Sequence, residues 1–385
     1  MYLVAEVTGM ACELPQLGAM QRLADKLPTP SLIVHADIVH RNVERYAQMA
    51  RRNGVKLRPH AKSHKSDVLA RWQLEAGCVG LTVGTFEEAD YFLAAGHRDL
   101  FIACPPVGKA REEAFAALAG AADPIVSVDS LEALAAVDAI GRSIGRPVRY
   151  YWEVDAGFGR FGTAVGEATV TAVIAAQRFR HAAFAGLMNF GGSSYLVADI
   201  EEVPHVGREE AERTVETAEM IRESGLDVPE ISVGSTPSAA SAVSVPGVTE
   251  LRVGTYIFND ATQVSLGVAE LADCAQTICT TVMSAPADGR IVIDAGSKSL
   301  PKETMCRFTA GFGVVLGYPG LVIERVSEEA SVLTWSVSDH VDPPKVGDQL
   351  QVISNHCCSA TYLFSHFWLI GDGVFERLRV NARTR

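Results

Sequence analysis

Short β-rich runs alternate with longer helical runs over residues 31–260, and this alternation constrains the fold more than any other feature of the sequence. The helical runs, for example residues 207–225, place apolar residues at the helical period between acids and arginines. Strand–helix alternation of this kind predicts a parallel sheet with helices packed outside it. The strand-like runs are SLIVH (31–35), VKLRPHA (55–61), GLTVG (80–84), LFIAC (100–104), IVSVD (125–129), YYWEVD (150–155), FAGLMNF (184–190), EISVGS (230–235) and ELRVGTYIF (250–258). Nine runs are one more than a (β/α)8 barrel needs, and periodicity alone does not identify the extra one.

The pattern changes after about residue 262. Runs such as CAQTICTTVMSA, RIVIDAG and SVLTWSVS are short, rich in β-branched residues and separated by turn residues. They predict an antiparallel β domain without a helix of note. The expected fold class is therefore α/β, with a (β/α)8 TIM-type barrel and a second, antiparallel β domain.

The composition excludes several classes of protein. Hydrophobic residues make up 48% of the 385 residues and charged residues 21%, which is a globular composition and rules out a disordered chain. The formal net charge of −12 repels phosphate backbones and argues against nucleic acid as a partner. No apolar stretch reaches the roughly 18 residues of a membrane span, and the acidic start has no basic region typical of a signal peptide. We therefore expect a cytoplasmic protein with no membrane partner, and we interpret most of the 8 irregularly spaced cysteines as reduced core residues.

A basic segment, residues 55–65 (VKLRPHAKSHK), follows strand alternation, so its apolar side chains share one face and its basic ones the other. On a barrel strand, the basic face would turn Arg58, His60 and Lys62 inward. Crowded cations need an anion or another partner, and they lower the pKa of a lysine so that a neutral amine nucleophile is exposed. The alternative is a solvated basic edge. A helical metal pair of His60 and His64 is disfavoured by the adjacent Pro59 and the missing acidic helper.

A glycine pattern, GFGRFG (157–162), matches G-x-G-x-x-G directly after a strand-like run. A dinucleotide site would need a small residue where Arg160 stands and an acid near residue 182, and neither is present. The alternative is a strand that ends at Asp155, followed by a tight turn that presents Arg160 to the mouth of the barrel.

Two turns rich in small residues, GSTPS (234–238) and RVGTY (252–256), end the last two strand-like runs. If the barrel starts at the basic segment, these turns follow strands seven and eight, where barrels commonly hold a phosphate on backbone N–H groups and small hydroxyls. A nucleophilic lysine, a phosphate site and an arginine at the mouth together indicate pyridoxal phosphate. The alternative is that both are ordinary turns.

His356 and Cys358 are separated by one residue in NHCC (355–358). On an extended backbone they would point to the same side, with Cys357 pointing away. An imidazole and a thiolate together favour Zn²⁺, and two protein ligands leave the open positions that a catalytic metal needs. The alternative is a core or surface position for both. Asp339 and His340 of the same domain could supply a further polar group.

Together these motifs resemble the fold-type III pyridoxal-phosphate enzymes of the D-threonine aldolase and D-serine dehydratase group, which are relatives of alanine racemase. The resemblance runs over residues 25–370. It is carried by RPHAKSHK (58–65), DAGFGRFG (155–162), GGSSY (191–195), VGSTPS (233–238), LRVGTY (251–256), DAGSK (294–298) and NHCC (355–358).

The resemblance implies a role for each candidate residue. Lys62 would form the internal aldimine with pyridoxal 5'-phosphate, and Arg160 would contact the phenolic oxygen of the cofactor. His356 and Cys358 would bind the divalent metal, with Zn²⁺ favoured over Mn²⁺ and Mg²⁺. The residues that would hold the cofactor's phosphate, or otherwise contact the cofactor, are Gly234, Ser235, Thr236, Gly254 and Thr255, together with Tyr195 and Tyr256.

The resemblance also implies the domain organisation. Residues 1–35 would join the β domain, which removes the surplus strand, residues 36–260 would form the cofactor-binding barrel, and residues 261–385 would form the β domain with the metal site. Such enzymes are usually homodimers. The sequence departs from the group at Asn189, where a histidine often stands, and at Asp339-His340-Val341, which replaces the usual Glu-His-Gly.

The expected activity is that of a lyase dependent on pyridoxal phosphate and a divalent metal, acting on small D-3-hydroxy amino acids. Cys358 and Tyr195 favour a dehydratase of the D-serine or 3-hydroxy-D-aspartate type, which gives a 2-oxo acid and ammonia. A D-threonine or 3-hydroxy-D-aspartate aldolase, which gives glycine and an aldehyde, is the first alternative. An amino-acid racemase and a non-catalytic pyridoxal-phosphate-binding protein are further alternatives, and a cofactor-free interaction protein is the last.

Overall fold

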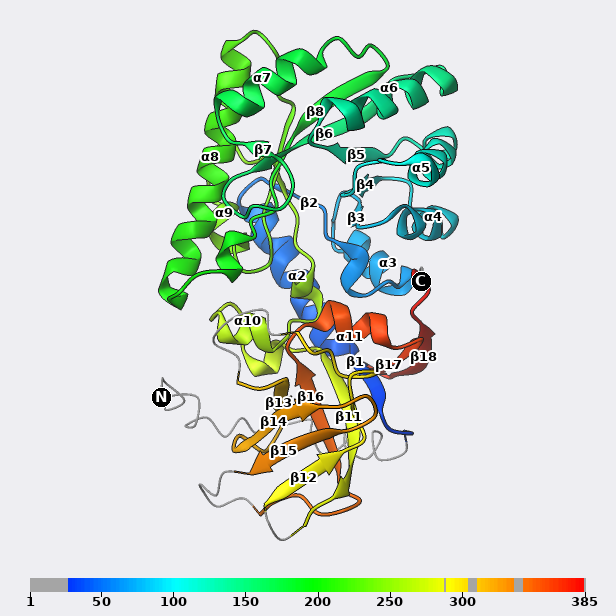
Figure 1. The fold of residues 1–385 in the computed structure, drawn as a ribbon, viewed down its shortest axis with the longest axis vertical. Coiled ribbons are helices and arrows are strands. Elements are labelled where there is room, and N and C mark those ends of the chain that lie inside the picture. Colours follow the sequence, from blue (N-terminus) through cyan, green and yellow to red (C-terminus); the bar gives the residue numbers. More distant parts are fainter. Residues whose placement is uncertain (1–26, 287–288, 304–309, 336–341, 384–385) are drawn as a thin grey trace. The chain divides into compact units, whose positions relative to one another are not determined.

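A computed structural model describes residues 27–286, 289–303, 310–335 and 342–383 (Figure 1). Contacts divide these residues into two compact units. The α/β unit comprises Val43–Tyr256 and residues 381–383, and the β unit comprises residues 27–42 and Ile257–Val380. The predicted domain limits, 1–35, 36–260 and 261–385, stay a prediction.

Parallel strands of the α/β unit pair in the order β2-β10-β9-β8-β6-β5-β4-β3, and the short β7 pairs with β6. The two ends of this path meet, because the N–H of Thr82 donates to the carbonyl of Pro59 over 2.7 Å and the N–H of Val79 donates to that of Leu57 over 2.9 Å. The sheet therefore closes, which confirms the predicted (β/α)8 barrel. Its strands are β2 (Lys56–Leu57), β3 (Leu81–Val83), β4 (Leu100–Ile102), β5 (Ile125–Val128), β6 (Val148–Asp155), β7 (Thr163–Ala164), β8 (Ala182–Met188), β9 (Glu230–Val233) and β10 (Glu250–Leu251).

Helices follow the barrel strands and lie on the outside of the sheet (Figure 1). Several begin at a hydroxyl residue that caps the first turn, as Thr85 does by accepting from the N–H of Glu88 and Ser130 by accepting from that of Ala133. The helices are α2 (Ala36–Arg52), α3 (Asp67–Glu75), α4 (Phe86–Ala94), α5 (Lys109–Ala121), α6 (Leu131–Ile144), α7 (Glu167–Ala176), α8 (Val203–Glu223) and α9 (Ala239–Ala242). Short 3₁₀ turns are η2 (Ala61–Ser63), η3 (Ser193–Tyr195), η4 (Ile200–Glu202), η5 (Thr255–Ile257) and η6 (Leu271–Asp273).

The β unit is built on one sheet with the strand order β12-β15-β14-β13-β16-β11-β1-β17-β18. Because β12 also pairs with β11, the first six strands of this order close on themselves, and β1, β17 and β18 extend the sheet. The strands are β1 (Ser31–His35), β11 (Gln276–Ser284), β12 (Arg290–Ile293), β13 (Gly313–Val315), β14 (Leu321–Val326), β15 (Ser331–Trp335), β16 (Gln349–Ser354), β17 (His366–Gly371) and β18 (Val374–Arg379). The run SLIVH is β1, antiparallel to β11 and parallel to β17, and this accounts for the ninth strand-like run.

Two predicted details differ. The basic segment forms a strand only at Lys56–Leu57, because Pro59 has no N–H for a sheet ladder and the chain then turns through η2. The β unit also holds two short helices, α10 (Ala261–Ser265) and α11 (Cys357–Leu363), where the sequence predicts no helix of note. Each begins after a residue with extended backbone, Asp260 and His356 respectively.

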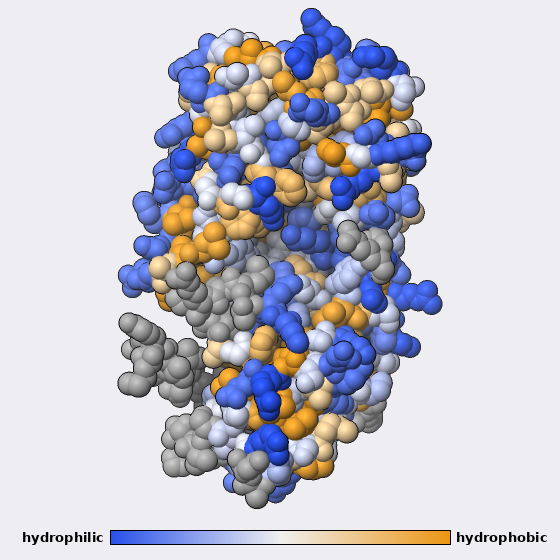
Figure 2. Space-filling view, viewed as in Figure 1, coloured by the Kyte–Doolittle hydropathy of each residue, from blue (hydrophilic) through white to orange (hydrophobic). Residues whose placement is uncertain are grey.

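No helix among the described residues is long and apolar enough to cross a membrane. On the face of the molecule in Figure 2, hydrophilic and hydrophobic residues are interspersed over both units.

Candidate active site

The predicted cofactor-binding residues follow the carboxyl ends of neighbouring barrel strands, which meet at one rim of a parallel barrel. Lys62 lies in η2 after β2, and Arg160 lies in the turn after β6. Tyr195 ends η3, which follows β8. Gly234, Ser235 and Thr236 follow β9, and Gly254, Thr255 and Tyr256 follow β10. The structure therefore gathers on one rim residues that are far apart in the sequence.

The turn that carries Lys62 packs directly against Gly254. The N–H of Lys62 donates to Nδ1 of His60 over 3.4 Å, and the N–H of His60 donates to the carbonyl of Val253 over 2.7 Å. A Cβ atom on residue 254 would lie 3.1 Å from Oγ of Ser63 and 3.3 Å from Cβ of His60. The lysine turn and the turn after β10 thus approach as closely as a glycine allows.

Cations do crowd this rim. Burial, together with the charges of Lys62, Arg252 and Lys65, lowers the pKa of His60 well below its ordinary value, so its imidazole is neutral. His64, in contrast, is fully buried, with Nε2 3.1 Å from Oε1 of Gln73, and is a core residue. The two histidines therefore do not form a metal pair.

Arg58 is buried as predicted, but its partners belong to the protein. Its Nε donates to Glu250 over 2.7 Å and a terminal nitrogen donates to Asp99 over 2.7 Å. Burial alone would lower the pKa of Arg58, but these two carboxylates outweigh burial and hold it above its ordinary value. Glu250 and Asp99 thus supply the anionic partner that a buried Arg58 needs. The segment is therefore not a solvated basic edge at this position.

The turns after β9 and β10 form a cup of small residues. Gly234 has a φ of +106°, which disfavours a side chain, and Oγ of Ser235 donates to the carbonyl of Gly191 over 2.6 Å. The hydroxyl of Thr236 accepts from the N–H of Tyr256 over 3.1 Å and so keeps its own proton to donate. The hydroxyl of Thr255 is buried without a hydrogen-bond partner in the described part of the chain. A buried hydroxyl without a partner is what a phosphate oxygen would satisfy, so the cup fits the phosphate of pyridoxal phosphate.

Tyr256 fits the predicted set of phosphate-contacting residues less well than its neighbours in the sequence do. Its ring is fully buried, and its hydroxyl accepts from Nε2 of Gln73 over 2.9 Å inside the α/β unit. Burial raises the pKa of Tyr256 well above its ordinary value. Its hydroxyl and its backbone N–H therefore both have partners within the protein.

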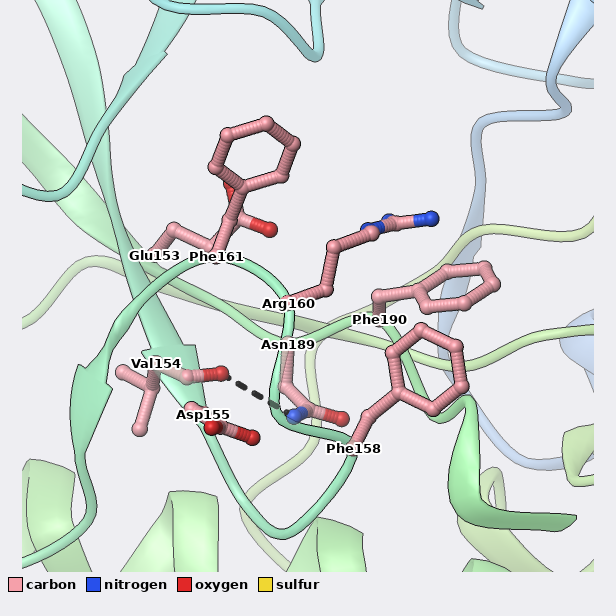
Figure 3. Close-up of a pocket in the computed structure, with 8 residues that line it drawn as sticks. All are labelled: Glu153, Val154, Asp155, Phe158, Arg160, Phe161, Asn189 and Phe190. Carbon is pink, nitrogen blue, oxygen red and sulfur yellow. Dashed lines mark hydrogen bonds between the residues drawn. The ribbon is translucent and has the colours of Figure 1, made fainter. Parts of the chain in front are cut away.

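Arg160 lies among phenylalanine rings at the end of β6 (Figure 3). The carboxylate of Asp155 shapes the turn by accepting from the N–H groups of Gly157 over 2.9 Å and Gly159 over 3.1 Å. The guanidinium stacks over Phe190 at 4.2 Å and lies 5.4 Å from the ring of Phe158. The chain then enters β7 rather than a helix, so the glycine pattern lacks the helix of a dinucleotide site.

Asn189, where the related enzymes often have a histidine, makes structural hydrogen bonds at the rim of the barrel. Its Nδ2 donates to the carbonyl of Val154 over 3.1 Å, and its Oδ1 accepts from the N–H of Gly191 over 2.8 Å (Figure 3). Its carbonyl accepts from the buried Arg252 over 2.7 Å. The amide nitrogen thus connects the end of β8 with β6, while the amide oxygen closes the turn that follows β8.

The second candidate site lies in the β unit, where Cys358 is close enough to His356 to raise the pKa of its imidazole. The prediction of extended backbone through both is wrong at Cys358, because His356 is extended (φ −139°, ψ 109°) but α11 begins at Cys357. Cys357 is buried and Cys358 is half-buried. Burial alone would lower the pKa of His356, but Cys358 and Asp260 outweigh it and raise the pKa well above its ordinary value.

Asp260 is a neighbour of this pair that the sequence analysis misses. Its Oδ2 lies 3.3 Å from Nδ1 of His356 and accepts from the N–H of Cys357 over 3.1 Å. The available signal was the pattern D-x-x-Q at 260–263, which is typical of a helix N-terminus. Asp339 and His340 lie outside the described residues.

The donor set fits a metal that takes further ligands from elsewhere. An imidazole nitrogen and a thiol are the ligand types that zinc prefers. Among the residues with described positions, no three His, Cys, Asp or Glu side chains gather closely enough to hold a metal ion by themselves. Two protein ligands leave positions for water or substrate, as in a catalytic metal centre.

Comparisons with known proteins match both units. Residues 34–262 match the family described as alanine racemase, N-terminal domain, and residues 275–370 match a putative serine dehydratase domain. The chain is 32% identical over 382 residues to a D-threo-3-hydroxyaspartate dehydratase from Delftia sp. (strain HT23), covering 93% of this chain and 99% of the relative. It is 31% identical over 364 residues to a D-threonine aldolase from Arthrobacter sp., covering 93% of both chains.

Two solved structures of a D-threo-3-hydroxyaspartate dehydratase are also similar. At 30% identity they superpose with TM-scores of 0.85 and 0.86, covering 92% and 95% of this chain and 98% of each structure's chain. One is of a cysteine-to-alanine variant in a metal-free form and the other is of a histidine-to-alanine variant. The two substituted residues stand two positions apart in that protein, as His356 and Cys358 do here.

Proposed function

We propose, from the premise that this chain belongs to the family with an alanine racemase N-terminal domain followed by a serine dehydratase domain, that it is a D-3-hydroxy amino acid dehydratase. The reaction removes water from a substrate of the D-serine or 3-hydroxy-D-aspartate type. The resulting enamine is hydrolysed to a 2-oxo acid and ammonia. The enzyme depends on pyridoxal phosphate and on a divalent metal.

The observation that carries the proposal is the imidazole–thiol pair of His356 and Cys358 in a chain that also has a lysine turn packed against Gly254 of the small-residue cup. The Delftia dehydratase supports it, because its substituted His and Cys have the same spacing. A racemase would have no use for such a pair, since exchange of the α-proton needs no Lewis acid.

The cofactor would be held by residues of the barrel rim. Lys62 would bond the aldehyde carbon, Arg160 would contact the phenolic oxygen, and the cup formed by Gly234, Ser235, Thr236, Gly254 and Thr255 would bind the phosphate. Tyr195 would contact the cofactor from the loop after β8, and Tyr256 would contribute only as part of the cup's frame. Pyridoxal phosphate, when bound, supplies an electron sink for negative charge at the substrate's α-carbon.

The metal would be held by Nε2 of His356 and Sγ of Cys358. We propose Zn²⁺, because a borderline-soft ion suits this donor pair, with Mn²⁺ and Mg²⁺ as the alternatives. When bound, the ion supplies a Lewis acid that helps the β-hydroxyl leave as hydroxide.

Residues of the chain manage the protons. Nζ of Lys62 would take the proton from the α-carbon of the substrate. The neutral imidazole of His60, whose Nδ1 accepts from the N–H of Lys62, orients the turn without adding a further positive charge next to that amine. Arg160, stacked on Phe190, holds a fixed cation at the rim.

An aldolase is the second candidate function. The 31% identity to the Arthrobacter D-threonine aldolase favours it. In that reaction a base takes the proton of the β-hydroxyl and the Cα–Cβ bond breaks, giving glycine and an aldehyde. The same cofactor and metal residues would serve.

Product analysis separates the two. The full chain is loaded with pyridoxal phosphate and zinc and given D-serine, D-threonine and both 3-hydroxy-D-aspartates, with and without a chelator. We expect ammonia and a 2-oxo acid that disappear with the chelator. Glycine and an aldehyde would assign an aldolase instead, and an L-amino acid formed in the presence of chelator would assign a racemase.

Matched variants test the residues. Lys62→Ala is expected to abolish turnover and borohydride labelling of the chain, whereas Lys56→Ala, an exposed lysine of β2, should change neither. His356→Ala should lose the metal. Retention of both metal and full activity in His356→Ala would remove the metal from the proposal.

The assembly and location of the enzyme are part of the proposal. We propose a cytoplasmic homodimer, as is usual for the group that the sequence resembles. Light scattering on the eluted protein tests the dimer, and a monomer with full activity would contradict it.

A further inference from the structure

We propose that Asp260 is a positioning residue for the metal site, acting through His356. This inference rests on the proposed metal ligands His356 and Cys358. Its content is that the carboxylate of Asp260 fixes the imidazole of His356 as the tautomer protonated on Nδ1, with the lone pair of Nε2 turned toward the ion.

The carboxylate lies in a dense set of hydrogen bonds. Asp260 is 1% exposed, and its Oδ1 accepts from the N–H of Gln263 over 3.0 Å, which caps α10. Its Oδ2 accepts from the N–H of Cys357 over 3.1 Å and lies 3.3 Å from Nδ1 of His356. Two backbone N–H groups therefore hold both oxygens in place, and the second oxygen faces the imidazole.

The arrangement determines which nitrogen can bind a metal. The ionised carboxylate of Asp260 can only accept hydrogen bonds. Because Nδ1 of His356 faces one of its oxygens, Nδ1 carries the proton and donates it to that oxygen. A histidine that binds a metal is neutral and has a single N–H, so a proton on Nδ1 leaves the lone pair of Nε2 for the ion. Carboxylates commonly orient metal-binding histidines in this way and raise their basicity.

The backbone around the metal ligands has separate supports. The hydroxyl of Thr262 donates to the carbonyl of Asn355 over 2.8 Å, and Nδ2 of Asn355 donates to the carbonyl of Gly311 over 2.9 Å. These bonds hold the residue before His356 without touching its ring. The contact of Asp260 with the imidazole can therefore be removed while these supports remain.

The test measures zinc affinity, not activity, on the full chain. Competition with a chromophoric chelator gives the zinc dissociation constant of the wild type and of Asp260→Asn, Thr262→Val and His356→Ala. Asn keeps an oxygen for the N–H of Gln263 but presents an N–H₂ group both to Nδ1 and to the N–H of Cys357, so the affinity is interpreted together with the tautomer of His356. We expect Asp260→Asn to bind zinc about 10- to 100-fold more weakly, Thr262→Val to stay within about two-fold because it does not touch the ring, and His356→Ala to lose specific binding.

The outcomes separate this inference from the proposed metal site. Wild-type affinity in Asp260→Asn, with binding lost in His356→Ala, would overturn the role of Asp260 alone. Wild-type affinity in His356→Ala would overturn the metal site itself. An equal loss in Thr262→Val and Asp260→Asn would mean that only the backbone matters, which also overturns the inference.

A spectroscopic readout reports the tautomer directly. In ¹⁵N-detected spectra of the zinc-loaded wild type, His356 should carry its proton on Nδ1, and this resonance should move or vanish in Asp260→Asn. A proton on Nε2 in the wild type would refute the inference. If Asp260→Asn fails to fold, Asp260→Ser serves in its place, because a serine also caps a helix but is too short to reach the imidazole.

Discussion

Replacing Arg58 with methionine should destabilise the barrel strongly, because it would strand a buried carboxylate. The side chains of Arg58 and Glu250 are 6% and 1% exposed, and Nε of Arg58 lies 2.7 Å from Oε2 of Glu250. The other oxygen of Glu250 accepts from the hydroxyl of Ser232 over 2.6 Å. Without Arg58, Glu250 would keep this hydroxyl as a hydrogen-bond partner, and Arg252 would be the remaining buried cation that interacts with its charge.

The two ion pairs of Arg58 differ strongly in their contribution to the free energy of unfolding. Removing one partner of a buried pair typically costs about 3–5 kcal/mol, because the other charge stays buried without compensation. The second pair of Arg58 is with Asp99, whose side chain is 50% exposed, and an exposed pair contributes about 0–1 kcal/mol. We therefore expect Arg58→Met to lower the free energy of unfolding by about 3–5 kcal/mol and Asp99→Asn by less than about 1 kcal/mol.

Urea unfolding followed by far-UV circular dichroism measures both changes. The double variant Arg58→Met/Glu250→Leu should recover most of the stability, since replacing a buried pair by apolar residues is often neutral. Arg58→Met that unfolds at the wild-type urea concentration, or a double variant no better than the single one, would refute the reasoning. Unchanged urea stability of Arg58→Met would also mean that Arg58 is not the partner of Glu250 and is available to an anionic ligand.

Three further predictions follow from single side chains. Burial lowers the pKa of His35 from 6.5 to about 4, so the unfolded chain takes up a proton that the folded chain excludes. The resulting loss of stability is absent above pH 6.5 and reaches about 3 kcal/mol below pH 4. The free energy of unfolding, measured by urea titration between these pH values, should therefore depend less on pH in His35→Leu than in the wild type. An equal pH dependence in both proteins would contradict this. Phe190→Leu removes the ring under Arg160, a contact worth about 0.5–1 kcal/mol, so a spectral titration should show about two- to five-fold weaker pyridoxal-phosphate binding. Unchanged affinity would mean that the stacking does not orient the guanidinium. Gly254→Ala places a Cβ atom 3.1 Å from Oγ of Ser63 and should displace the lysine turn, so that the cofactor is lost on dialysis while the free energy of unfolding falls by only about 1 kcal/mol. Full cofactor retention would show that the two turns can separate without loss of binding.

The barrel could be predicted from the sequence because each of its strands is a local pattern. A run of buried β-branched residues followed by a helix needs no information from elsewhere in the chain. The same holds for Lys62, Arg160 and the small turns, since each follows a strand and the carboxyl ends of parallel strands meet. The prediction failed within the basic segment because Pro59 ends the ladder, so alternation no longer decides where Lys62 points.

Partners that come from distant segments could not be predicted in the same way. Arg58 meets Glu250 across 192 residues of sequence, and nothing near either residue indicates the other. A basic face that needs an anion therefore has two explanations, a ligand or a carboxylate of the protein, and only the pairing of β2 with β10 decides between them. The same reasoning applies to Asn189, which bonds to Val154 and Arg252 from other strand ends of the rim.

His356 and Cys358 are neighbours, but not because of the extended backbone that the sequence predicts. Extended backbone brings residues i and i+2 to one side, but here His356 is the N-cap of α11 and Cys358 is the second residue of the helix. An N-cap side chain lies over the first turn of its helix, so it can meet the second helical residue just as well. The relative position of the two donors therefore depends on where α11 begins. The N–H of Cys357 at that point is bonded to Asp260, 97 residues earlier in the chain, which is also the residue that faces the imidazole. The carboxylate of Asp260 thus contacts both the first residue of α11 and the ring of His356. The sequence NHCC by itself therefore predicts neither where the helix begins nor how the ring is oriented.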